Sequence, residues 1–509
     1  MAMPDTVHLS ELVDFPSRCF INSLPVEVIL EIFALVFEAI PRNQRHESKI
    51  SLTLSHTCRA WRDAALEGKF LWTFIPLVST CIARLYVERS SPLSFNVQYS
   101  YMKFSQRSRY ADAFRWLLHD LSRVREMIHA DNRDDWAQVV DKRDEWDDTI
   151  FDKSTAPLLE ALQLVRIENI EMLRSHIFMN STPRSLRNLG LYYSDLPADS
   201  ASILFAPALT HLEISFCLNT WTCLAHSLKD LLSLEVLKVA GHDWEECTDL
   251  QPFTISESMK VLEISANSGV ILSFFRAARI PLRSAVHVSP IDDAGSSQFI
   301  SRQTFPLMIT DLVDAVFSRV TTAFELGITH DGLSIADLGP DSTEIRMWVE
   351  PQTELPSLLQ AGSIIQYSTT LILAHTRRHR NPELAFGALL ISLAQLRTIR
   401  PFQSLRKLGL SLELLDEPRH APVWRVVADS FPQIEEIGLG RAGLVHVLGE
   451  ANYRDIFPSL TLVILSRGVG VTRSIGMKAR QNREGVRFVS VDLLPYFPDH
   501  NLPFDDDMD

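Results

Sequence analysis

The sequence predicts an α/β fold in which an N-terminal helical module precedes a long array of strand–turn–helix repeats. Two observations support this fold class. Between Leu24 and Trp72, apolar side chains recur at helical spacing. From about residue 90 onward, a segment of the form L-x-x-L-x-L returns many times, and a turn and a helix-like stretch follow each copy.

The first helix of the module is expected to begin at Leu24. Pro25 is tolerated in a first helical turn, and Glu27 lies near the positive end of the helix dipole. An apolar stripe follows at spacings i, i+3, i+4, i+7 and i+8, made by Ile29, Ile32, Phe33, Val36 and Phe37. Further apolar side chains extend the surface beyond this stripe: Val28, Leu30 and Leu35. Only a seam of three glutamates is polar: Glu27, Glu31 and Glu38.

A second helix is expected around Leu54, Cys58, Trp61 and Ala65, and the pair Leu71–Trp72 closes the module. A helix that is apolar nearly all round must be covered on two sides, whereas a module this small offers cover for one. We therefore expect the second side to bind a partner protein.

The repeats have a nearly constant period. Copies begin at Leu186, Leu209, Leu234 and Met259, in steps of 23, 25 and 25 residues, and the pattern resumes at Leu405, Ile434 and Leu460. These steps lie in the range of about 20–29 residues that is typical of leucine-rich repeats. Weaker copies are expected at Leu93-Phe95-Val97, Val124-Met127, Leu159-Leu162-Leu164, Phe324-Leu326-Ile328, Leu371-Leu373 and Val486-Phe488-Val489.

Each repeat should place its leucines in a shared core beneath a helix. The stack would then form an irregular leucine-rich-repeat horseshoe, with parallel strands on the concave face and helices on the convex face. The residues between the leucines would line the concave face, and their mixed charge is that of a protein-binding surface: Tyr192, Glu213, Ser215, Lys238, Glu263, Ser265, Arg406 and Lys407. The alternative is an ordinary α/β domain whose parallel strands share this pattern.

Composition restricts the class of protein. A chain of 509 residues exceeds one compact core, and its 46% apolar and 22% charged residues are typical of globular proteins. A net charge of -14 argues against a nucleic-acid partner, and no apolar run reaches the length of a membrane span. Six cysteines without a C-x-x-C pair and an N-terminus without a secretory pattern indicate a reducing compartment, the cytoplasm or the nucleus.

Motifs for chemistry are weak. Gly438 to Gly443 matches the G-x-G-x-x-G phosphate loop, but its strand comes late in the array, and Glu450 and Asp455 are too close to bind a ribose. His375 and His379 stand among arginines, which would repel a metal cation. We therefore expect no catalytic residue, no cofactor and no metal site. A nucleotide-binding enzyme is the less favoured alternative.

The N-terminal module resembles an F-box. The motif reads Leu24-Pro25-x-Glu27-x-Ile29-Leu30-x-Ile32-Phe33, then Leu54-Ser55-His56-Thr57-Cys58-Arg59-x-Trp61-Arg62-x-x-Ala65, then Leu71-Trp72. It is especially similar to F-box proteins of mushroom-forming fungi, which often carry degenerate leucine-rich repeats behind the F-box.

The resemblance implies a substrate-recognition subunit of an SCF-type cullin–RING ubiquitin ligase, without catalytic residues of its own. Its F-box would bind a Skp-family adaptor and its repeats an unknown substrate protein. By motif position, the residues facing the adaptor would be Leu24, Pro25, Ile29, Ile32 and Phe33. Those completing the contact or the small core beneath it would be Leu54, Cys58, Trp61, Leu71 and Trp72. The alternatives are a helical cap on the array and a scaffold protein outside the ligase.

Two departures from the family pattern bear on adaptor binding. Thr57 stands where an aliphatic residue is usual, and the loop Pro41–Lys49 is longer and more charged. The expected organisation is a disordered N-terminus (1–19), an F-box (20–77), a linker with first repeat-like units (78–155), a leucine-rich-repeat-like domain (156–495) and an acidic disordered tail (496–509).

Overall fold

A computed structural model of the 509-residue chain divides into two compact units. Unit 1 comprises Met1–Val165 and Leu173–Leu186, and unit 2 comprises Arg166–Met172 and Arg187–Asp509. The structure describes residues 24–41, 45, 49–100, 112–114, 116–117, 121–130, 156–165, 184–193, 206–217, 224, 226–241, 244, 250–290, 304–326, 332–339, 342–349, 367–374, 392–393, 395–411, 421–439, 443–448, 455–466, 479, 481 and 485–491.

Unit 1 begins with four short helical elements around one aromatic core. They are α1 (Val26–Glu38), α2 (Ile50–Thr57), α3 (Arg59–Glu67) and the 3-10 helix η3 (Lys69–Trp72). The side chains of Phe33, Leu71 and Trp72 are fully buried there. The Trp72 indole donates a hydrogen bond of 2.8 Å to the Ala65 carbonyl, and the Ser51 hydroxyl donates one of 2.6 Å to the Leu71 carbonyl. These bonds fix η3 against α2 and α3.

The single second helix predicted around Leu54 to Ala65 is wrong, because the backbone breaks at Cys58. This residue is extended, with φ -155° and ψ 175°, and it separates α2 from α3. The Cys58 sulfur accepts a hydrogen bond of 3.5 Å from the Trp61 amide, so it caps the first turn of α3. The chain thereby turns between α2 and α3.

Residues 78–155 were expected to hold a linker and the first repeat-like units, and their described part contains a helix and two strands. Helix α4 (Thr80–Ser90) packs on η3 through Trp72 and Tyr86, whose rings are 4.9 Å apart. A parallel sheet starts directly after η3, in the order β1 (Phe74–Ile75), β2 (Phe95–Ser100), β3 (Val124–Ala130) and β4 (Ala161–Val165). Arg123 donates to the Val87 carbonyl at 3.1 Å and so ties the end of α4 to the start of β3.

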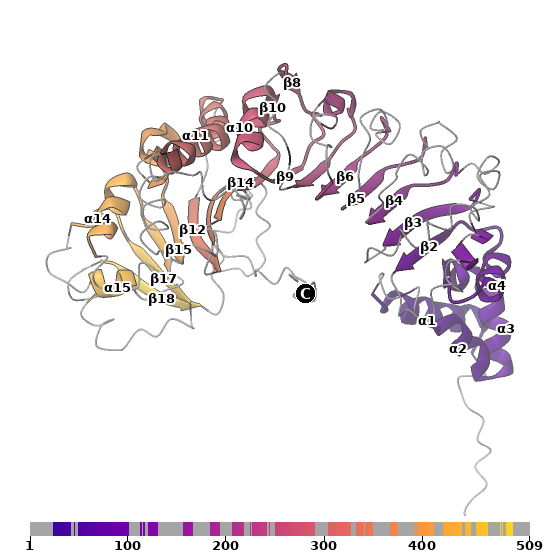
Figure 1. Ribbon diagram of the computed structural model, residues 1–509. Coiled ribbons are helices and arrows are strands. Elements are labelled where there is room, and N and C mark those ends of the chain that lie inside the picture. Colours follow the sequence, from indigo (N-terminus) through magenta and orange to yellow (C-terminus); the bar gives the residue numbers. More distant parts are fainter. Residues whose placement is uncertain are drawn as a thin grey trace, which may run out of the picture. The chain divides into compact units, whose positions relative to one another are not determined.

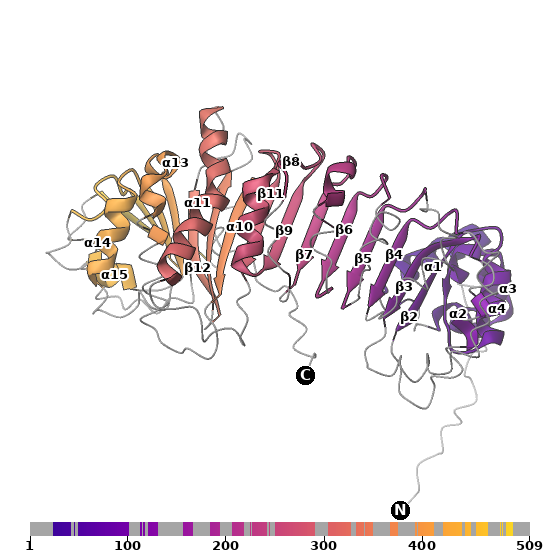
Figure 2. The same ribbon diagram turned by 45° about the horizontal axis from the view of Figure 1, so that its top comes forward.

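Unit 2 contains parallel strands at positions predicted from the L-x-x-L-x-L pattern. Strands β5 (Asn188–Tyr192), β6 (His211–Ser215), β7 (Val236–Ala240), β9 (Val261–Ala266) and β11 (Ala285–Pro290) lie side by side and parallel (Figure 2). Their buried apolar residues are in register, as in the row Leu189, Leu212, Leu237, Leu262 and Val286. The strand positions predicted from the L-x-x-L-x-L copies at Leu186, Leu209, Leu234 and Met259 are confirmed.

Three later strands depart from the predicted parallel order. They are β12 (Gly332–Gly339), β13 (Ser342–Val349) and β14 (Tyr367–Ala374). The sheet runs β11-β14-β13-β12-β15, and β13 is antiparallel to both of its neighbours. The sheet is therefore largely, not wholly, parallel. The weak copy expected at Phe324-Leu326-Ile328 is also wrong, because Phe324 belongs to helix α11 (Thr304–Glu325) and Leu326 directly follows it.

The C-terminal strands resume the parallel order as β15 (Lys407–Ser411), β16 (Glu436–Leu439), β17 (Leu462–Ser466) and β18 (Arg487–Val491). The helices of unit 2 include α10 (Ser268–Ala277), α11, α13 (Arg400–Gln403), α14 (Ala421–Ser430) and α15 (Gly443–Leu448). Figure 1 shows α10, α11, α14 and α15 on one side of the strands. We call the other side of the β5–β11 sheet its open face. Smaller elements are β8 (Phe253–Thr254), β10 (Ala278–Arg279) and η8 (Leu228–Asp230).

Side-chain hydrogen bonds connect the turns that follow neighbouring strands. The Cys217 thiol donates to the Leu191 carbonyl at 3.5 Å, and the Trp244 indole donates to the Cys217 carbonyl at 2.6 Å. The Asn267 amide donates to the Trp244 carbonyl at 2.6 Å, while its oxygen accepts from Val270 at the start of α10. One side-chain donor after each of these strands thus satisfies a carbonyl of the preceding strand or turn, which adds to the strand ladder.

Candidate partner-binding surfaces

Helix α1 presents three different faces. Ile29, Phe33 and Phe37 are buried against the rest of unit 1. Pro25, Val28, Leu35, Val36 and Ala39 are exposed and Ile32 is partly exposed, and their spacing places them on one side of the helix. Glu27, Glu31 and Glu38 are exposed along a third side. We call Pro25, Val28, Ile32, Leu35, Val36 and Ala39 the α1 apolar stripe.

The predicted adaptor-facing residues therefore separate into two groups. Ile29 and Phe33 are 3% and 0% exposed, so both lie in the core of unit 1. Pro25 is exposed, and Leu24 and Ile32 are partly exposed. The physical reason is the angle between the faces: positions 29, 33 and 37 share one side of the helix, whereas positions 28, 32, 35, 36 and 39 share another.

The remaining motif residues build the core beneath α1. Leu54, Leu71 and Trp72 are buried, and Cys58 and Trp61 are partly exposed. The Trp61 ring packs edge-on against Phe33 at 5.1 Å. These five residues were predicted either to complete the adaptor contact or to form the small core beneath it. Their burial and packing favour the core.

Both departures from the family pattern are accommodated locally. Thr57 is exposed, and its hydroxyl donates to the Thr53 carbonyl at 3.0 Å, so its polar group is satisfied within α2. In the loop Pro41–Lys49, Arg45 donates from Nε to the Ile40 carbonyl at 3.0 Å. Its guanidinium also lies 5.1 Å from the centre of the Phe37 ring. Arg45 thereby satisfies a carbonyl just beyond the end of α1 and covers its core aromatic.

The open face of unit 2 carries most of the predicted substrate residues. Tyr192, Glu213, Ser215, Lys238, Glu263 and Ser265 alternate with the buried apolar residues of β5, β6, β7 and β9 and are partly exposed. Lys407 occupies the corresponding alternation in β15. Arg406 does not lie on this face, because it precedes β15, is exposed, and points its guanidinium to Glu435 at 3.6 Å.

The charged groups of the open face are paired with each other. The Lys238 ammonium lies 3.5 Å from the Glu263 carboxylate across β7 and β9. Burial and the neighbouring Glu213 carboxylate, which also shares a hydrogen bond with the phenol, raise the pKa of Tyr192 above its ordinary value. This part of the sheet thus offers a polar surface with little free charge.

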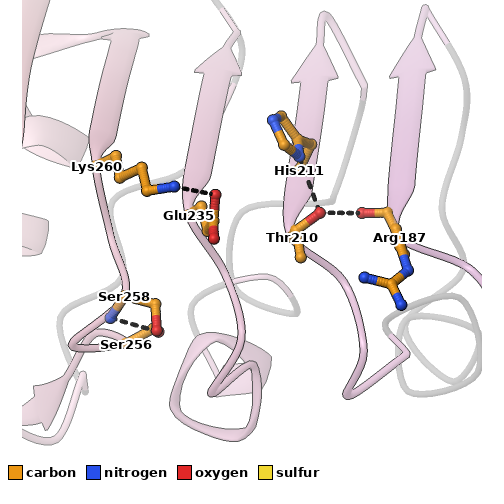
Figure 3. A network of polar contacts seen from close by, with 7 residues as sticks. All are labelled: Arg187, Thr210, His211, Glu235, Ser256, Ser258 and Lys260. Carbon is orange, nitrogen blue, oxygen red and sulfur yellow. Dashed lines mark hydrogen bonds and ion pairs between the residues drawn. The ribbon is translucent and has the colours of Figure 1, made fainter.

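A second polar row runs along the ends at which the strands begin (Figure 3). The Lys260 ammonium lies 2.6 Å from the Glu235 carboxylate, and the Thr210 hydroxyl contacts the Arg187 carbonyl at 3.2 Å and His211 Nδ1 at 2.9 Å. The hydrogen bond from Lys260 lowers the pKa of Glu235, and the charges of Lys260 and His211 act in the same direction. We call this edge of β5 to β11 the strand-start rim.

Among the residues that the structure describes, no group of three or more His, Cys, Asp or Glu side chains is placed to hold a metal ion. Within those residues no helix has both the length and the apolar character needed to cross a bilayer. Positions 440–442 of the glycine-rich segment, His375 and His379 lie outside the described residues.

Short helices around an aromatic core, with a continuous apolar stripe left outside, define a protein-docking module. Residues 21–75 match the F-box-like family. The chain therefore carries an F-box-like domain, which suggests a role in binding the adaptor of a ubiquitin ligase. F-box proteins are generally non-catalytic adaptors. No curated protein matches the chain.

Proposed function

We propose that the chain is the substrate-recognition subunit of an SCF-type cullin–RING ubiquitin ligase. The F-box binds a Skp-family adaptor through the α1 apolar stripe, and the sheet of unit 2 binds the target protein. The observation that carries the proposal is the exposed stripe within residues that match the F-box-like family. A non-ligase scaffold that uses the same two surfaces is the alternative.

The stripe supplies enough apolar area for an interface. Leu35, Val28 and Val36 are 63%, 41% and 40% exposed. Fully burying such a side chain contributes about 1.5–3 kcal/mol, so covering the exposed part of each contributes roughly 1 kcal/mol. The three side chains together then account for about a hundredfold in affinity. Glu27, Glu31 and Glu38 lie on another side of the helix and orient the adaptor toward the stripe.

The proposal also includes the type of repeat in unit 2 and the compartment in which the protein works. The repeats form a degenerate leucine-rich-repeat array with a concave substrate face, as in F-box proteins of mushroom-forming fungi. The L-x-x-L-x-L spacing, the register of the buried rows and the turn ladder through Cys217 and Asn267 support it. The protein works in the cytoplasm or the nucleus, where the ligase acts.

Co-purification tests the proposal. The full chain is co-expressed with a Skp-family adaptor and a cullin, and the variant Leu35→Asp should lose both partners. Leu326→Asp is the matched control, because Leu326 is 70% exposed in unit 2. Ile29→Asp is unsuitable, because its charge would enter the core of unit 1.

The outcomes separate the alternatives. Retention of the adaptor by Leu35→Asp at the wild-type level would overturn the docking surface. A stable complex with the adaptor that never contains the cullin would favour the scaffold. Circular dichroism of each variant establishes that unit 1 remains folded.

A further inference from the structure

The guanidinium group of Arg319 binds the turn at residues 281–284, which leads into β11. Arg319 of α11 donates from Nη2 to the Pro281, Leu282 and Ser284 carbonyls at 2.9, 3.2 and 3.1 Å. Its Nη1 is buried and makes no hydrogen bond within the described residues. Burial lowers the pKa of Arg319 to about 10, so its positive charge persists at neutral pH.

Two exposed arginines lie in or next to the same turn along the chain. Arg283 lies within it, and Arg279 lies in β10 just before it; both are exposed and form no ion pair in the described part of the chain. Lys260 is adjacent, because its carbonyl accepts the Ala285 amide at 2.7 Å. We call Lys260, Arg279, Arg283 and Arg319 the cationic turn. The amides of Leu282 and Arg283 also donate to no acceptor in the described chain.

Acidic groups near the turn do not balance these charges. Glu235 is engaged with Lys260 at 2.6 Å. Glu257, in the turn before β9, is exposed and forms no ion pair within the described residues. The cationic turn is thus a net positive site on a chain whose net charge is -14. By contrast, Lys238 and Glu263 on the open face neutralise each other.

We propose that the cationic turn binds an acidic segment of the target protein, with Asp or Glu carboxylates contacting Arg279 and Arg283. The proposal rests on the proposed function, because it names the chemistry of the substrate that unit 2 holds. Charge complementarity supports it: the planar guanidinium groups match carboxylate geometry, and their charges are not used inside the fold. Arg319 fixes the turn and adds a positive charge that no described carboxylate offsets. Two exposed guanidinium groups form too small a basic surface for the phosphate backbone of a nucleic acid.

Fluorescence anisotropy on the full chain tests the site. The probe is a labelled peptide of alternating glutamate and glycine, measured at low and at physiological salt. The double variant Arg279→Gln with Arg283→Gln should bind it about tenfold more weakly. Arg187→Gln is the matched control, since Arg187 is an exposed arginine of the strand-start rim without an ion pair in the described chain, four strands away. This control should bind within about twofold of wild type.

Each outcome bears on the site. Equal losses for the double variant and Arg187→Gln would show diffuse attraction and overturn it. Preference for a single-stranded oligonucleotide or an anionic vesicle over the peptide, or binding of a phosphoserine peptide alone, would overturn the carboxylate assignment. Adaptor co-purification is also measured with the double variant, so that the ligase role and the peptide-binding role of the cationic turn are tested separately. Peptide binding without an adaptor complex refutes the ligase role alone, and an adaptor complex without peptide binding refutes the cationic turn alone.

Discussion

Replacing Gly241 by alanine places one methyl group in the space occupied by the Trp244 ring. The added Cβ would lie 2.2 Å from Cε2 and 2.6 Å from Cζ2 and Nε1 of that ring. Trp244 is 4% exposed and donates to the Cys217 carbonyl at 2.6 Å, so it has little room to move. The methyl group therefore displaces the indole and breaks the turn ladder of unit 2.

The expected cost follows from the contacts that Trp244 loses. Its indole and its carbonyl take part in two hydrogen bonds, each with a net contribution of about 0.5–1.5 kcal/mol. Forcing an extra methyl group into a packed site costs about 1–3 kcal/mol, and weakening the two hydrogen bonds adds about 1 kcal/mol. We expect Gly241→Ala to lower the free energy of unfolding of unit 2 by about 2–4 kcal/mol.

Urea unfolding followed by circular dichroism measures this loss, and hydrogen exchange locates it in the turns from Cys217 to Asn267. Trp244→Ala provides the background control, because it removes the three ring atoms that lie nearest to the added methyl group. In that background Gly241→Ala should cost less than about 0.5 kcal/mol. An equal cost in both backgrounds would refute the reasoning, since the clash with Trp244 would then not be the cause.

Three further predictions concern other parts of the chain. Phe33→Ala should destabilise unit 1 by about 3–5 kcal/mol, whereas Leu35→Ala should change its thermal stability by less than about 0.5 kcal/mol. Arg319→Met should cost about 2–4 kcal/mol in urea unfolding, because three carbonyls lose a charged donor, while the exposed Arg283→Met should be nearly neutral. The raised pKa of Tyr192 adds stability that is present below pH 10 and lost as pH rises beyond it, because the unfolded chain then releases the proton first. Urea midpoints between pH 9 and 11 should fall less steeply for Tyr192→Phe, and an unchanged slope would contradict this.

Much of the strand pattern could be predicted because it depends on local alternation. Leu189 and Leu191 must point to one side of a strand, and the same pair recurs in β6, β7 and β9. The order of β12, β13 and β14 could not be predicted in this way. Apolar alternation identifies a strand but not its neighbour, and the pairing of β11 with β14 depends on contacts that are distant in the sequence.

The docking helix shows a different limit of sequence reasoning. Apolar periodicity located α1 and its excess of apolar surface, but two stripes fit the same helix. Phe33 and Leu35 are equally apolar, and only packing against Trp61 and the rest of unit 1 assigns Phe33 to the core. The seam of three glutamates did not decide between them. The break at Cys58 was likewise hidden, because an extended residue between two helices leaves no apolar signal.

The antiparallel strand β13 has a consequence for folding. In the regular part of unit 2 each strand pairs with the strand of the same sheet that follows it in the chain, as Leu237 does with Leu262, so order can spread stepwise. Val286 of β11 instead pairs with Thr369 of β14. This contact can form only after the ribosome has synthesised the intervening chain, which includes β12 and β13. Closing so long a loop is slow, and it separates unit 2 into two kinetic segments that meet at β14. A nascent chain that has emerged only as far as β11 would carry an uncovered strand edge, which is where a chaperone would be needed.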